Sequence, residues 1–508
     1  MADELYRGTM PVPEDFDVFW GERMAEADAA PLEWELSPAD IPASDSCEFF
    51  DLRFTGLRGE LLYAKYLHPR VEGPVPLVLQ FHGYPGASRS WFEQASFAGM
   101  GCALIALDNP GQGGLSWDAG SYMGTTVSGH LVAGLEGRVE DLYYVRLYQN
   151  LRLLARIVRE LDGIDLSRVY VNGASQGGGM GLAFSALNPD LVAKATILYP
   201  FLSDYRAVYD LGADEVAYEG IRYYSHWFDP DGEREDEWFS KLAYVDTVSF
   251  AHLVRCPVFF GTGLADTVCP PKTQDAVWNQ LSCEKERHFY EGKGHEEIEE
   301  FDDAIEDYLG CESGARRRVK FIAEDGRDLY ARVIAPAGEG PHPLVMLFHD
   351  YDRVPRGWHH MTRYLAAGYA VMQLENDVDA SPDDFERAVS DALSAYEAAG
   401  WLKDVDAERI SVFGEGFGGA LALAVAAARP VECASALASY PLAPLMEDAE
   451  RIEAPVLFGI CRMDEVASPS EQDSFAARLP HVRVKNYPKY IHERVNAFEN
   501  ELLAFLIG

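Results

Sequence analysis

The chain lacks long hydrophobic runs. None of its apolar stretches reaches the roughly 18–20 residues that a transmembrane helix requires. Residues 1–30 also lack the basic start and apolar segment of a secretory signal peptide, and residues 10–24 instead predict an amphipathic helix with several aromatic side chains. We therefore expect a soluble, cytoplasmic protein that does not associate with membranes.

Cysteine is also scarce, with eight residues among 508 and no Cys-x-x-Cys pair. Such pairs are the usual signature of zinc sites and thiol redox centres. Scattered cysteines favour reduced thiols in a cytosolic protein, although an even number leaves disulfide bonds open. We predict no metal site.

Basic side chains are few: 43 Lys and Arg stand against 82 Asp and Glu, which gives a formal net charge of −39. A surface of this sign repels phosphate groups, which argues against nucleic acids and anionic membranes as partners. The one basic cluster, Arg316-Arg317-Arg318, fits a solvated linker better than a binding patch. The charge suits a neutral small-molecule substrate.

The length of the chain predicts two domains, because one hydrophobic core rarely organises so many residues. Short apolar runs alternate with helical stretches through both halves, as in βαβ units that build a parallel sheet. Six runs in the first half have counterparts in the same order in the second half. They are residues 77–81, 103–107, 169–171, 195–199, 258–260 and 288–290, matched by 344–348, 370–374, 410–413, 434–438, 456–458 and 482–487.

Short motifs repeat as well. Phe81-His82-Gly83-Tyr84 in the first half matches Phe348-His349-Asp350-Tyr351 in the second. We therefore predict a tandem duplication, with one α/β domain over residues 1–310 and another over 319–508. Each is expected to be a mostly parallel, doubly wound sheet flanked by helices. Residues 311–318 have no apolar period and are predicted to form the linker.

The two halves differ in their insertions. From Ser175 to Asp266 there are 91 positions, against 48 from Gly416 to Asp464, and much of the excess falls in the aromatic-rich segment 203–246. In a doubly wound sheet such an insert lies above the carboxyl ends of the strands, where substrates bind. An aromatic packing or oligomer surface is the alternative interpretation.

Gly173-Ala174-Ser175-Gln176-Gly177 follows a predicted strand and precedes a predicted helix. This is the setting of the G-x-S-x-G nucleophile elbow of the α/β-hydrolase fold. Glycines must flank the serine because larger side chains would collide with the neighbouring strand and helix. Ser175 is therefore the predicted nucleophile.

A serine hydroxyl needs a base to accept its proton, and a histidine base needs a carboxylate to orient it. In α/β hydrolases the chain order is serine, acid, histidine. Asp266 and His295 follow the two late strands of the first half in that order. Singly, Asp266 could be a helix N-cap and His295 a surface histidine, but together with Ser175 they favour a catalytic triad.

The oxyanion of a tetrahedral intermediate needs two hydrogen-bond donors. The backbone N–H of Gln176, directly after the nucleophile, is one predicted donor. The backbone N–H of Tyr84, in the loop after residues 77–81, is the other.

The first half resembles the carbohydrate esterases of family seven, the acetyl xylan esterases and cephalosporin C deacetylases. The resemblance implies an enzyme that removes acetyl groups from short oligosaccharides and other small acetylated compounds without a cofactor, typically as a ring-like homo-oligomer. One element departs from the family, because its Arg-Gly-Gln reads Pro110-Gly111-Gln112 here. The matching residues are 13–20, 81–84, 173–177, 199–204, 227–230, 256–258, 266, 269–271 and 295–296.

The second half resembles the dienelactone hydrolases, but its elbow carries Gly416 where a serine should stand. Asp464 and His492 remain, 28 positions apart, against 29 between the acid and the base of the first half. Without a nucleophile these residues cannot form an acyl-enzyme. Glu415 and Cys461 do not lie at the elbow tip, so we predict a non-catalytic domain with a structural role.

We predict a serine esterase that hydrolyses acetyl esters of small carbohydrates or related metabolites through an acyl-enzyme. A broader carboxylesterase, a thioesterase or an aminoacyl peptidase would use the same triad. A non-catalytic binding or scaffold protein is the alternative of another class, and the intact triad argues against it.

Overall fold

The computed structural model describes residues 3–41, 44–123, 129–213, 216–311, 314–336, 340–350, 357–375, 384–493 and 495–507. It separates into two compact units. Unit 1 comprises Met1–Ala39, Phe49–Arg89 and Cys102–Gly310, and unit 2 comprises Asp40–Glu48, Ser90–Gly101 and Cys311–Gly508.

Unit 1 is built on a nine-stranded sheet with the order β1-β2-β3-β5-β4-β6-β7-β8-β9. Strands β5, β4, β6, β7, β8 and β9 pair in parallel, whereas β3 pairs with β5 and β1 pairs with β2 in antiparallel fashion. The strands are β1 (Trp34–Pro38), β2 (Cys47–Thr55), β3 (Leu61–Pro69), β4 (Val75–Phe81), β5 (Ala103–Asp108), β6 (Ile164–Ala174), β7 (Val192–Leu198), β8 (Val258–Gly263) and β9 (Lys285–Tyr290).

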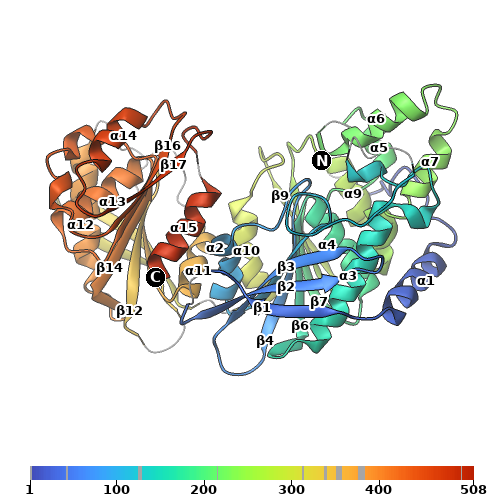
Figure 1. The fold of residues 1–508 in the computed structure, drawn as a ribbon, viewed down its shortest axis with the longest axis horizontal. Coiled ribbons are helices and arrows are strands. Elements are labelled where there is room, and N and C mark those ends of the chain that lie inside the picture. Colours follow the sequence, from blue (N-terminus) through green and yellow to red (C-terminus); the bar gives the residue numbers. More distant parts are fainter. Residues whose placement is uncertain are drawn as a thin grey trace. The chain divides into compact units, whose positions relative to one another are not determined.

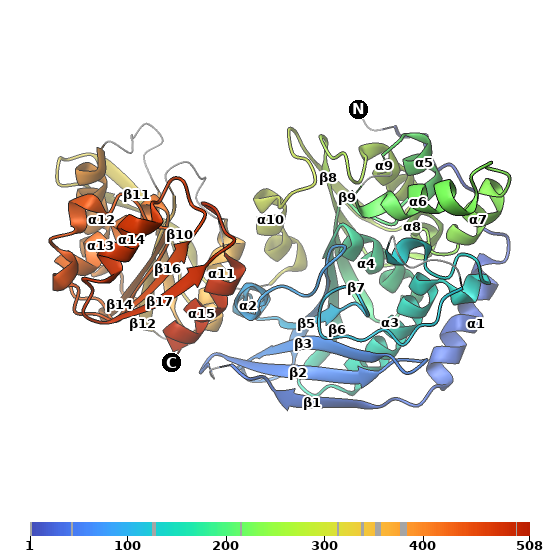
Figure 2. The same ribbon diagram turned by 45° about the horizontal axis from the view of Figure 1, so that its top comes forward.

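Helices cover both faces of this sheet (Figures 1 and 2). Gly181 of α4 lies against Ile197 of β7, whereas Phe301 of α10 and the neighbouring Leu198 both lie against Gly261. Because consecutive strand residues point to opposite faces, α4 and α10 cover opposite sides. The helices are α1 (Phe16–Ala29), α3 (Tyr143–Glu160), α4 (Gln176–Leu187), α5 (Tyr205–Asp210), α6 (Glu219–Phe228), α7 (Glu235–Leu242), α8 (Thr247–Phe250), α9 (Pro271–Gln280) and α10 (Glu299–Leu309).

The N-terminal helix predicted over residues 10–24 is α1, shifted toward the C-terminus. Its aromatic side chains are buried: Phe16 meets Phe250 with ring centroids 5.0 Å apart, and Trp20 donates to the carbonyl of Tyr244 at 2.9 Å. The helix is therefore part of the unit 1 core.

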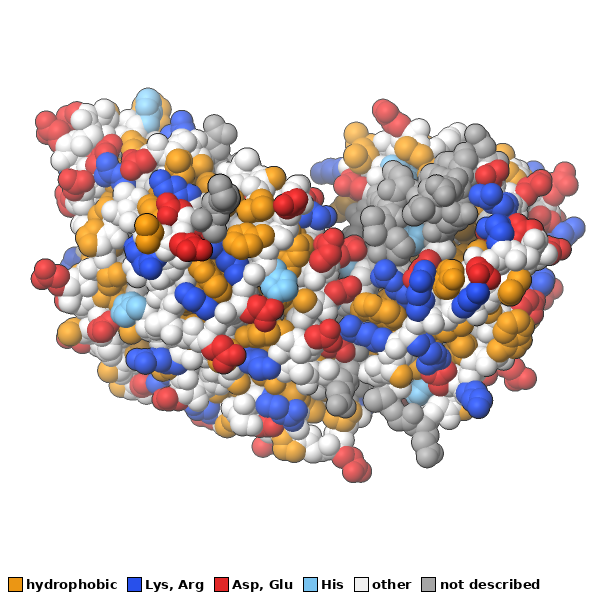
Figure 3. Space-filling model, turned by 180° about the vertical axis from the view of Figure 1, so that it is seen from behind, with side chains coloured by type: hydrophobic (Ala, Val, Ile, Leu, Met, Phe, Trp, Pro, Cys, Tyr) orange, Lys and Arg blue, Asp and Glu red, His pale blue; other side chains and the backbone are white. Residues whose placement is uncertain are grey.

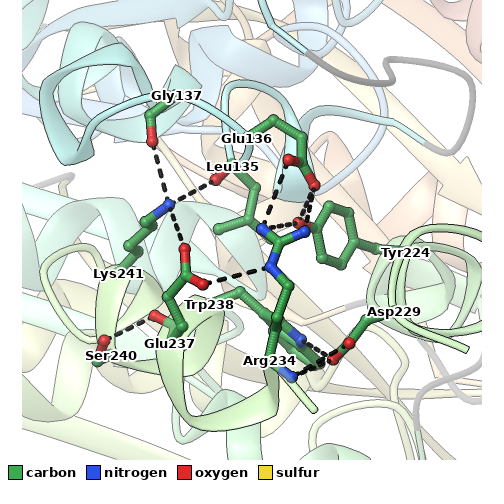
Figure 4. A network of polar contacts seen from close by, with 10 residues as sticks. All are labelled: Leu135, Glu136, Gly137, Tyr224, Asp229, Arg234, Glu237, Trp238, Ser240 and Lys241. Atoms are coloured by element: carbon green, nitrogen blue, oxygen red, sulfur yellow. Dashed lines mark hydrogen bonds and ion pairs between the residues drawn. The ribbon is translucent and has the colours of Figure 1, made fainter. Parts of the chain in front are cut away.

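The aromatic insert 203–246 forms α5, α6 and α7, apart from residues 214–215, which lie outside the described part of the chain. A polar network holds α7 against residues 135–137 (Figure 4). Arg234 pairs with Glu136 and Glu237 at 3.4 and 3.3 Å, and Lys241 donates to the carbonyls of Leu135 and Gly137 at 3.2 and 3.1 Å.

Unit 2 repeats the same sheet order without the first strand, as β10-β11-β13-β12-β14-β15-β16-β17, with eight strands. Strands β13, β12, β14, β15, β16 and β17 pair in parallel, and β11 pairs antiparallel with both β10 and β13. The strands are β10 (Arg316–Ile322), β11 (Asp328–Ile334), β12 (His342–Phe348), β13 (Ala370–Leu374), β14 (Val405–Glu415), β15 (Ala434–Leu437), β16 (Val456–Cys461) and β17 (Val482–Tyr487).

The unit 2 helices include α2, which comes from the first half of the sequence. It packs on α11: Phe92 meets Tyr364 with centroids 4.9 Å apart, and Thr362 donates to the carbonyl of Ser96 at 2.9 Å. The helices are α2 (Trp91–Gly99), α11 (Trp358–Ala366), α12 (Phe385–Ala399), α13 (Phe417–Ala428), α14 (Pro469–Ala476) and α15 (Asn496–Ile507).

The predicted architecture of two mostly parallel, helix-flanked sheets is confirmed. The interpretation of Arg316-Arg317-Arg318 as linker is wrong, because all three residues lie in β10. Their charges are paired there: Arg317 binds Asp404 and Arg318 binds Glu375. In the described residues no helix is both long and apolar enough to cross a membrane.

Candidate active site

Ser175 stands at a sharp turn between β6 and α4. Its φ of 57° and ψ of −124° lie in a region that L-residues rarely adopt, which is the backbone geometry of a strained elbow. Added Cβ atoms at Gly173 and Gly177 would lie 2.2 and 1.9 Å from backbone oxygens. The glycines are therefore required by space, as the sequence predicted.

The three predicted triad residues lie together in the order expected. His295 Nε2 is 2.9 Å from Ser175 Oγ, and His295 Nδ1 is 2.9 Å from Asp266 Oδ2. Ser175 and Asp266 are buried, and His295 is partly exposed. The hydroxyl, the imidazole and the carboxylate thus form one continuous hydrogen-bonded chain.

Asp266 is fixed by the loop that follows β8. Its Oδ1 accepts the backbone N–H groups of Val268 and Cys269 at 2.9 and 2.8 Å, which leaves Oδ2 directed at the imidazole. The alternative role as N-cap of α9 is not observed, since that helix is preceded by Pro270. The acid is held in one orientation before any substrate binds.

The two predicted oxyanion donors come from segments beside Ser175. Gln176 is the first residue of α4, where backbone N–H groups have no acceptor within the helix. Tyr84 follows Gly83, at which an added Cβ would lie 3.9 Å from the Ser175 Cβ. The loop after β4 therefore lies next to Ser175.

His82 shapes this loop, a role that the sequence did not suggest. Its Nδ1 lies 2.7 Å from the carbonyl of Gly83, and its Nε2 accepts the backbone N–H of Asn109 at 3.0 Å. These partners require a neutral ring protonated on Nδ1. Burial lowers the pKa of His82, which favours the same neutral form.

A buried amide pair supports the elbow from behind. Gln112 and Gln176 exchange two hydrogen bonds at 2.9 and 2.8 Å, and the hydroxyl of Tyr144 donates to Gln176 Oε1 at 2.7 Å. Gln112 ends the Pro110-Gly111-Gln112 element, so its side chain reaches the nucleophile helix although the arginine of that element is absent.

The model of the family described as acetyl xylan esterase (AXE1) matches residues 3–311. The chain belongs to the acetyl xylan esterase family. The model of the dienelactone hydrolase family matches residues 331–501, so the recognition of both halves is confirmed.

Relatives agree with the family assignment. Acetyl esterase Axe7A of Xylanibacter ruminicola is 28% identical over 299 residues, which are 56% of this chain and 64% of that protein. This chain thus matches less than two thirds of the length of that relative. Among solved structures, acetyl xylan esterase 1 from Thermoanaerobacterium sp. JW/SL YS485 is 38% identical, with a TM-score of 0.59, covering 60% of this chain and 96% of that one. The acetyl xylan esterase from Paenibacillus sp. R4 is 27% identical, with a TM-score of 0.58, covering 60% and 97%.

Cys269 lies close to two residues of the triad, Asp266 and His295. Ligand atoms of Asp266, Cys269 and His295 all lie within 4.8 Å of one another, a spacing at which a metal ion could bind. However, both ring nitrogens of His295 are engaged with Ser175 and Asp266, and burial raises the pKa of the Cys269 thiol well above its usual value. Because neither imidazole nitrogen is left over for a metal ion, the arrangement fits a triad better than a metal site.

Aromatic rings connect the insert to the loop after β4. Tyr84 stacks on Phe201 with centroids 6.0 Å apart, and Phe201 contacts Tyr218 at 4.2 Å. The ring of Tyr199 lies 4.6 Å from that of His295. Because Tyr218 and Trp238 are fully buried, much of the insert packs as core, while Trp227 remains 64% exposed.

The second copy keeps the acid and the histidine. His492 Nδ1 lies 2.7 Å from Asp464 Oδ2, and Asp464 Oδ1 accepts the N–H groups of Val466 and Ala467 at 2.8 Å each. Cys461 ends β16 with its pKa raised to about 12 by burial, which disfavours a thiolate nucleophile.

Proposed function

We propose that the first domain is a serine esterase acting on acetyl esters of small carbohydrates or related metabolites. The observation that carries the proposal is the unbroken chain from Ser175 Oγ through His295 to Asp266 at a strained elbow. Family membership and the acetyl esterases among the relatives support acetyl as the acyl group.

The reaction has two halves. Ser175 Oγ attacks the ester carbonyl carbon while His295 Nε2 accepts the hydroxyl proton, and Asp266 stabilises the imidazolium. The N–H groups of Gln176 and Tyr84 receive the oxyanion. Collapse of the intermediate breaks the bond to the alcohol, which leaves with the proton from His295. Water then attacks the acetyl-enzyme in the same way and releases acetate.

The duplication provides matched variants for the test. We expect His295→Ala and Ser175→Ala to lower the turnover of p-nitrophenyl acetate by about 10⁴–10⁶-fold. The paired variant His492→Ala should retain wild-type turnover, because it removes the equivalent histidine from the half without a nucleophile. Substantial residual activity in Ser175→Ala would show that the nucleophile lies elsewhere.

The acyl group is tested with the same enzyme. A p-nitrophenyl series from acetate to octanoate should show kcat/KM falling with chain length, since one methylene in a small pocket is worth about 1–3 kcal/mol. Acetylated xylo-oligosaccharides and cephalosporin C then distinguish carbohydrate from other acetylated substrates. A preference for longer esters would leave the triad intact and reject the acetyl assignment.

A further inference from the structure

The second domain holds a carboxylate at the place where a nucleophile would stand. Gly416 has φ 55° and ψ −124°, which is the backbone conformation of Ser175 to within a few degrees. A Cβ added to Gly416 would lie 2.2 Å from Asp350 Oδ2 and 2.3 Å from its Cγ. The Asp350 carboxylate therefore fills the space of a serine side chain.

Asp350 is held by a backbone N–H that corresponds to an oxyanion-hole donor, together with a tyrosine hydroxyl and the histidine of the second copy. Its Oδ1 accepts the backbone N–H of Phe417 at 2.9 Å and the hydroxyl of Tyr440 at 3.2 Å, and its Oδ2 lies 2.7 Å from His492 Nε2. Phe417 directly follows the elbow position, as Gln176 does in the first domain. The donor equivalent to an oxyanion-hole donor is thus engaged by a carboxylate of the chain itself.

The environment accounts for the stability of this charge. Asp350 is 2% exposed, and a carboxylate buried to this degree is costly unless it is paired and hydrogen-bonded. His492 supplies the charge, because it lies between Asp350 and Asp464 and hydrogen bonding to them raises its pKa. Within the described part of the chain, the Phe417 N–H, the Tyr440 hydroxyl and His492 thus contact the carboxylate.

The two domains differ both at the elbow position and at the loop position beside it. The position that corresponds to Asp350 is Gly83, where an added Cβ would lie 3.9 Å from the Ser175 Cβ. The first domain thus has a side chain at the elbow and none at the loop, and the second has the reverse. In the second domain the Asp350 carboxylate leaves no room for a side chain at Gly416, because an added Cβ would lie 2.2 Å from Oδ2.

We propose that the second domain retains an anion-binding site for small carboxylates and that the Asp350 side chain occupies it as an internal ligand. This assigns a ligand class to the half of the chain that has no nucleophile, and it does not depend on the esterase activity of the first half. The site is filled in the native protein, and removal of the Asp350 side chain opens it to acetate.

The first test measures thermal unfolding of the full chain in sodium acetate and in sodium chloride at equal ionic strength and pH 6. Acetate should raise the Tm of Asp350→Gly by about 2 °C or more relative to chloride, because a ligand that binds only the folded state stabilises it. Wild type and Asp350→Asn should lack this increment, since their site is occupied.

Acetate that binds at the first domain would shift all variants equally, so the difference between variants reports the second site. If Asp350→Gly fails to fold, Asp350→Ala provides the same comparison. An acetate response in the opened variant no larger than that of wild type would overturn the proposal.

A double-mutant cycle tests occupancy independently of acetate. Gly416→Ser should strongly destabilise the wild-type chain, because the new Cβ meets the Asp350 carboxylate. In the Asp350→Gly background the Gly416→Ser change should lower the midpoint denaturant concentration much less. The backbone strain of a serine at φ 55° is present in both backgrounds and cancels in the comparison. Equal losses in both backgrounds would show that Asp350 does not occupy the elbow space.

Discussion

At the scale of single residues, His492 and His295 differ in what faces Nε2. His295 meets a hydroxyl and one carboxylate, whereas His492 meets carboxylates on both sides, with the ring of Tyr440 5.3 Å away. Hydrogen bonding to Asp350 is the largest cause that raises the pKa of His492. Protonation of His492 stabilises the folded state, and this contribution is complete below the pKa of about 6.5 that the residue has in the unfolded chain. The contribution is lost as the pH rises through the higher pKa of His492 in the folded protein.

Asp350→Asn should lower the pKa of His492. The amide keeps an oxygen for the Phe417 N–H, and its NH₂ group can donate to a neutral His492, so the fold is preserved while the charge partner is lost. NMR titration of the His492 Cε1 proton, assigned with His492→Gln, should show a lower midpoint in the variant. The variant should also lose less thermal stability than the wild type as the pH rises above about 6.5. An unchanged midpoint would contradict the pairing.

The sequence located Ser175, Asp266 and His295 because each belongs to a local pattern in a fixed chain order. Asp350 escaped this reasoning, since it is 66 positions from Gly416 and belongs to no catalytic motif. A signal was nevertheless present: at the matched loop position, glycine in the first half is aspartate in the second. A charged residue replacing glycine beside a lost nucleophile indicates a filled site.

At the scale of elements, the parallel strands could be predicted and the antiparallel ones could not. Strands buried on both faces read as continuous apolar runs, as in β4 and β8. In contrast, β2 mixes buried with less buried residues, and β10 has only Phe321 buried and contains three consecutive arginines. These charges misled the linker prediction because the strand lies at the sheet edge, where side chains reach solvent and acidic partners.

Helix α2 shows a second limit of sequence reasoning. The sequence alone could not indicate that α11 would cover the apolar residues of α2. The two helices are equivalent in the duplication, since Phe92 and His359 each lie ten positions after His82 and His349. Their contacts are reciprocal: Phe92 meets Tyr364, and Phe97 meets His359 at 5.2 Å.

Gly99→Ala should destabilise the protein, although alanine is the better helix former. An added Cβ at Gly99 would lie 1.7 Å from the backbone oxygen of Thr362, and a backbone atom cannot rotate away. Overpacking of this kind costs about 1–3 kcal/mol or more. Chemical denaturation should report the loss.

Gly21→Ala is the matched control within α1. An added Cβ there has no atom within 4 Å, so the substitution should be neutral or stabilise by up to about 1 kcal/mol. If both variants were equally stable, the close approach of α2 and α11 would be wrong.

At the scale of the whole molecule, the excess of acidic residues gives a formal net charge of −39. Acidic, basic and hydrophobic side chains are mixed over the face in Figure 3. The face drawn there therefore does not resemble a docking surface of a single charge. The cytoplasmic location and the homo-oligomer inferred from the sequence stay predictions.

Removing the residues after Gly310 tests whether α2 depends on α11. A protein that ends at Gly310 keeps the triad but loses α11, which covers Phe92 and Phe97 of α2. Both side chains are at most 1% exposed in the full chain, and burial of each contributes about 1.5–3 kcal/mol. We expect the truncated protein to have a lower Tm and to aggregate, as measured by scanning calorimetry and size-exclusion chromatography.

The double substitution Phe92→Gln with Phe97→Lys should harm the full-length protein and improve the truncated one. In the full chain these substitutions remove buried contacts and lower stability. In the truncated chain they replace exposed apolar rings by polar groups, so they should reduce aggregation and recover soluble protein. A truncated chain that is monomeric and as stable as the full chain without these changes would mean that α2 does not depend on α11. Because the sign of the effect reverses, the experiment separates a loss of helix packing from a general effect of the substitutions on α2.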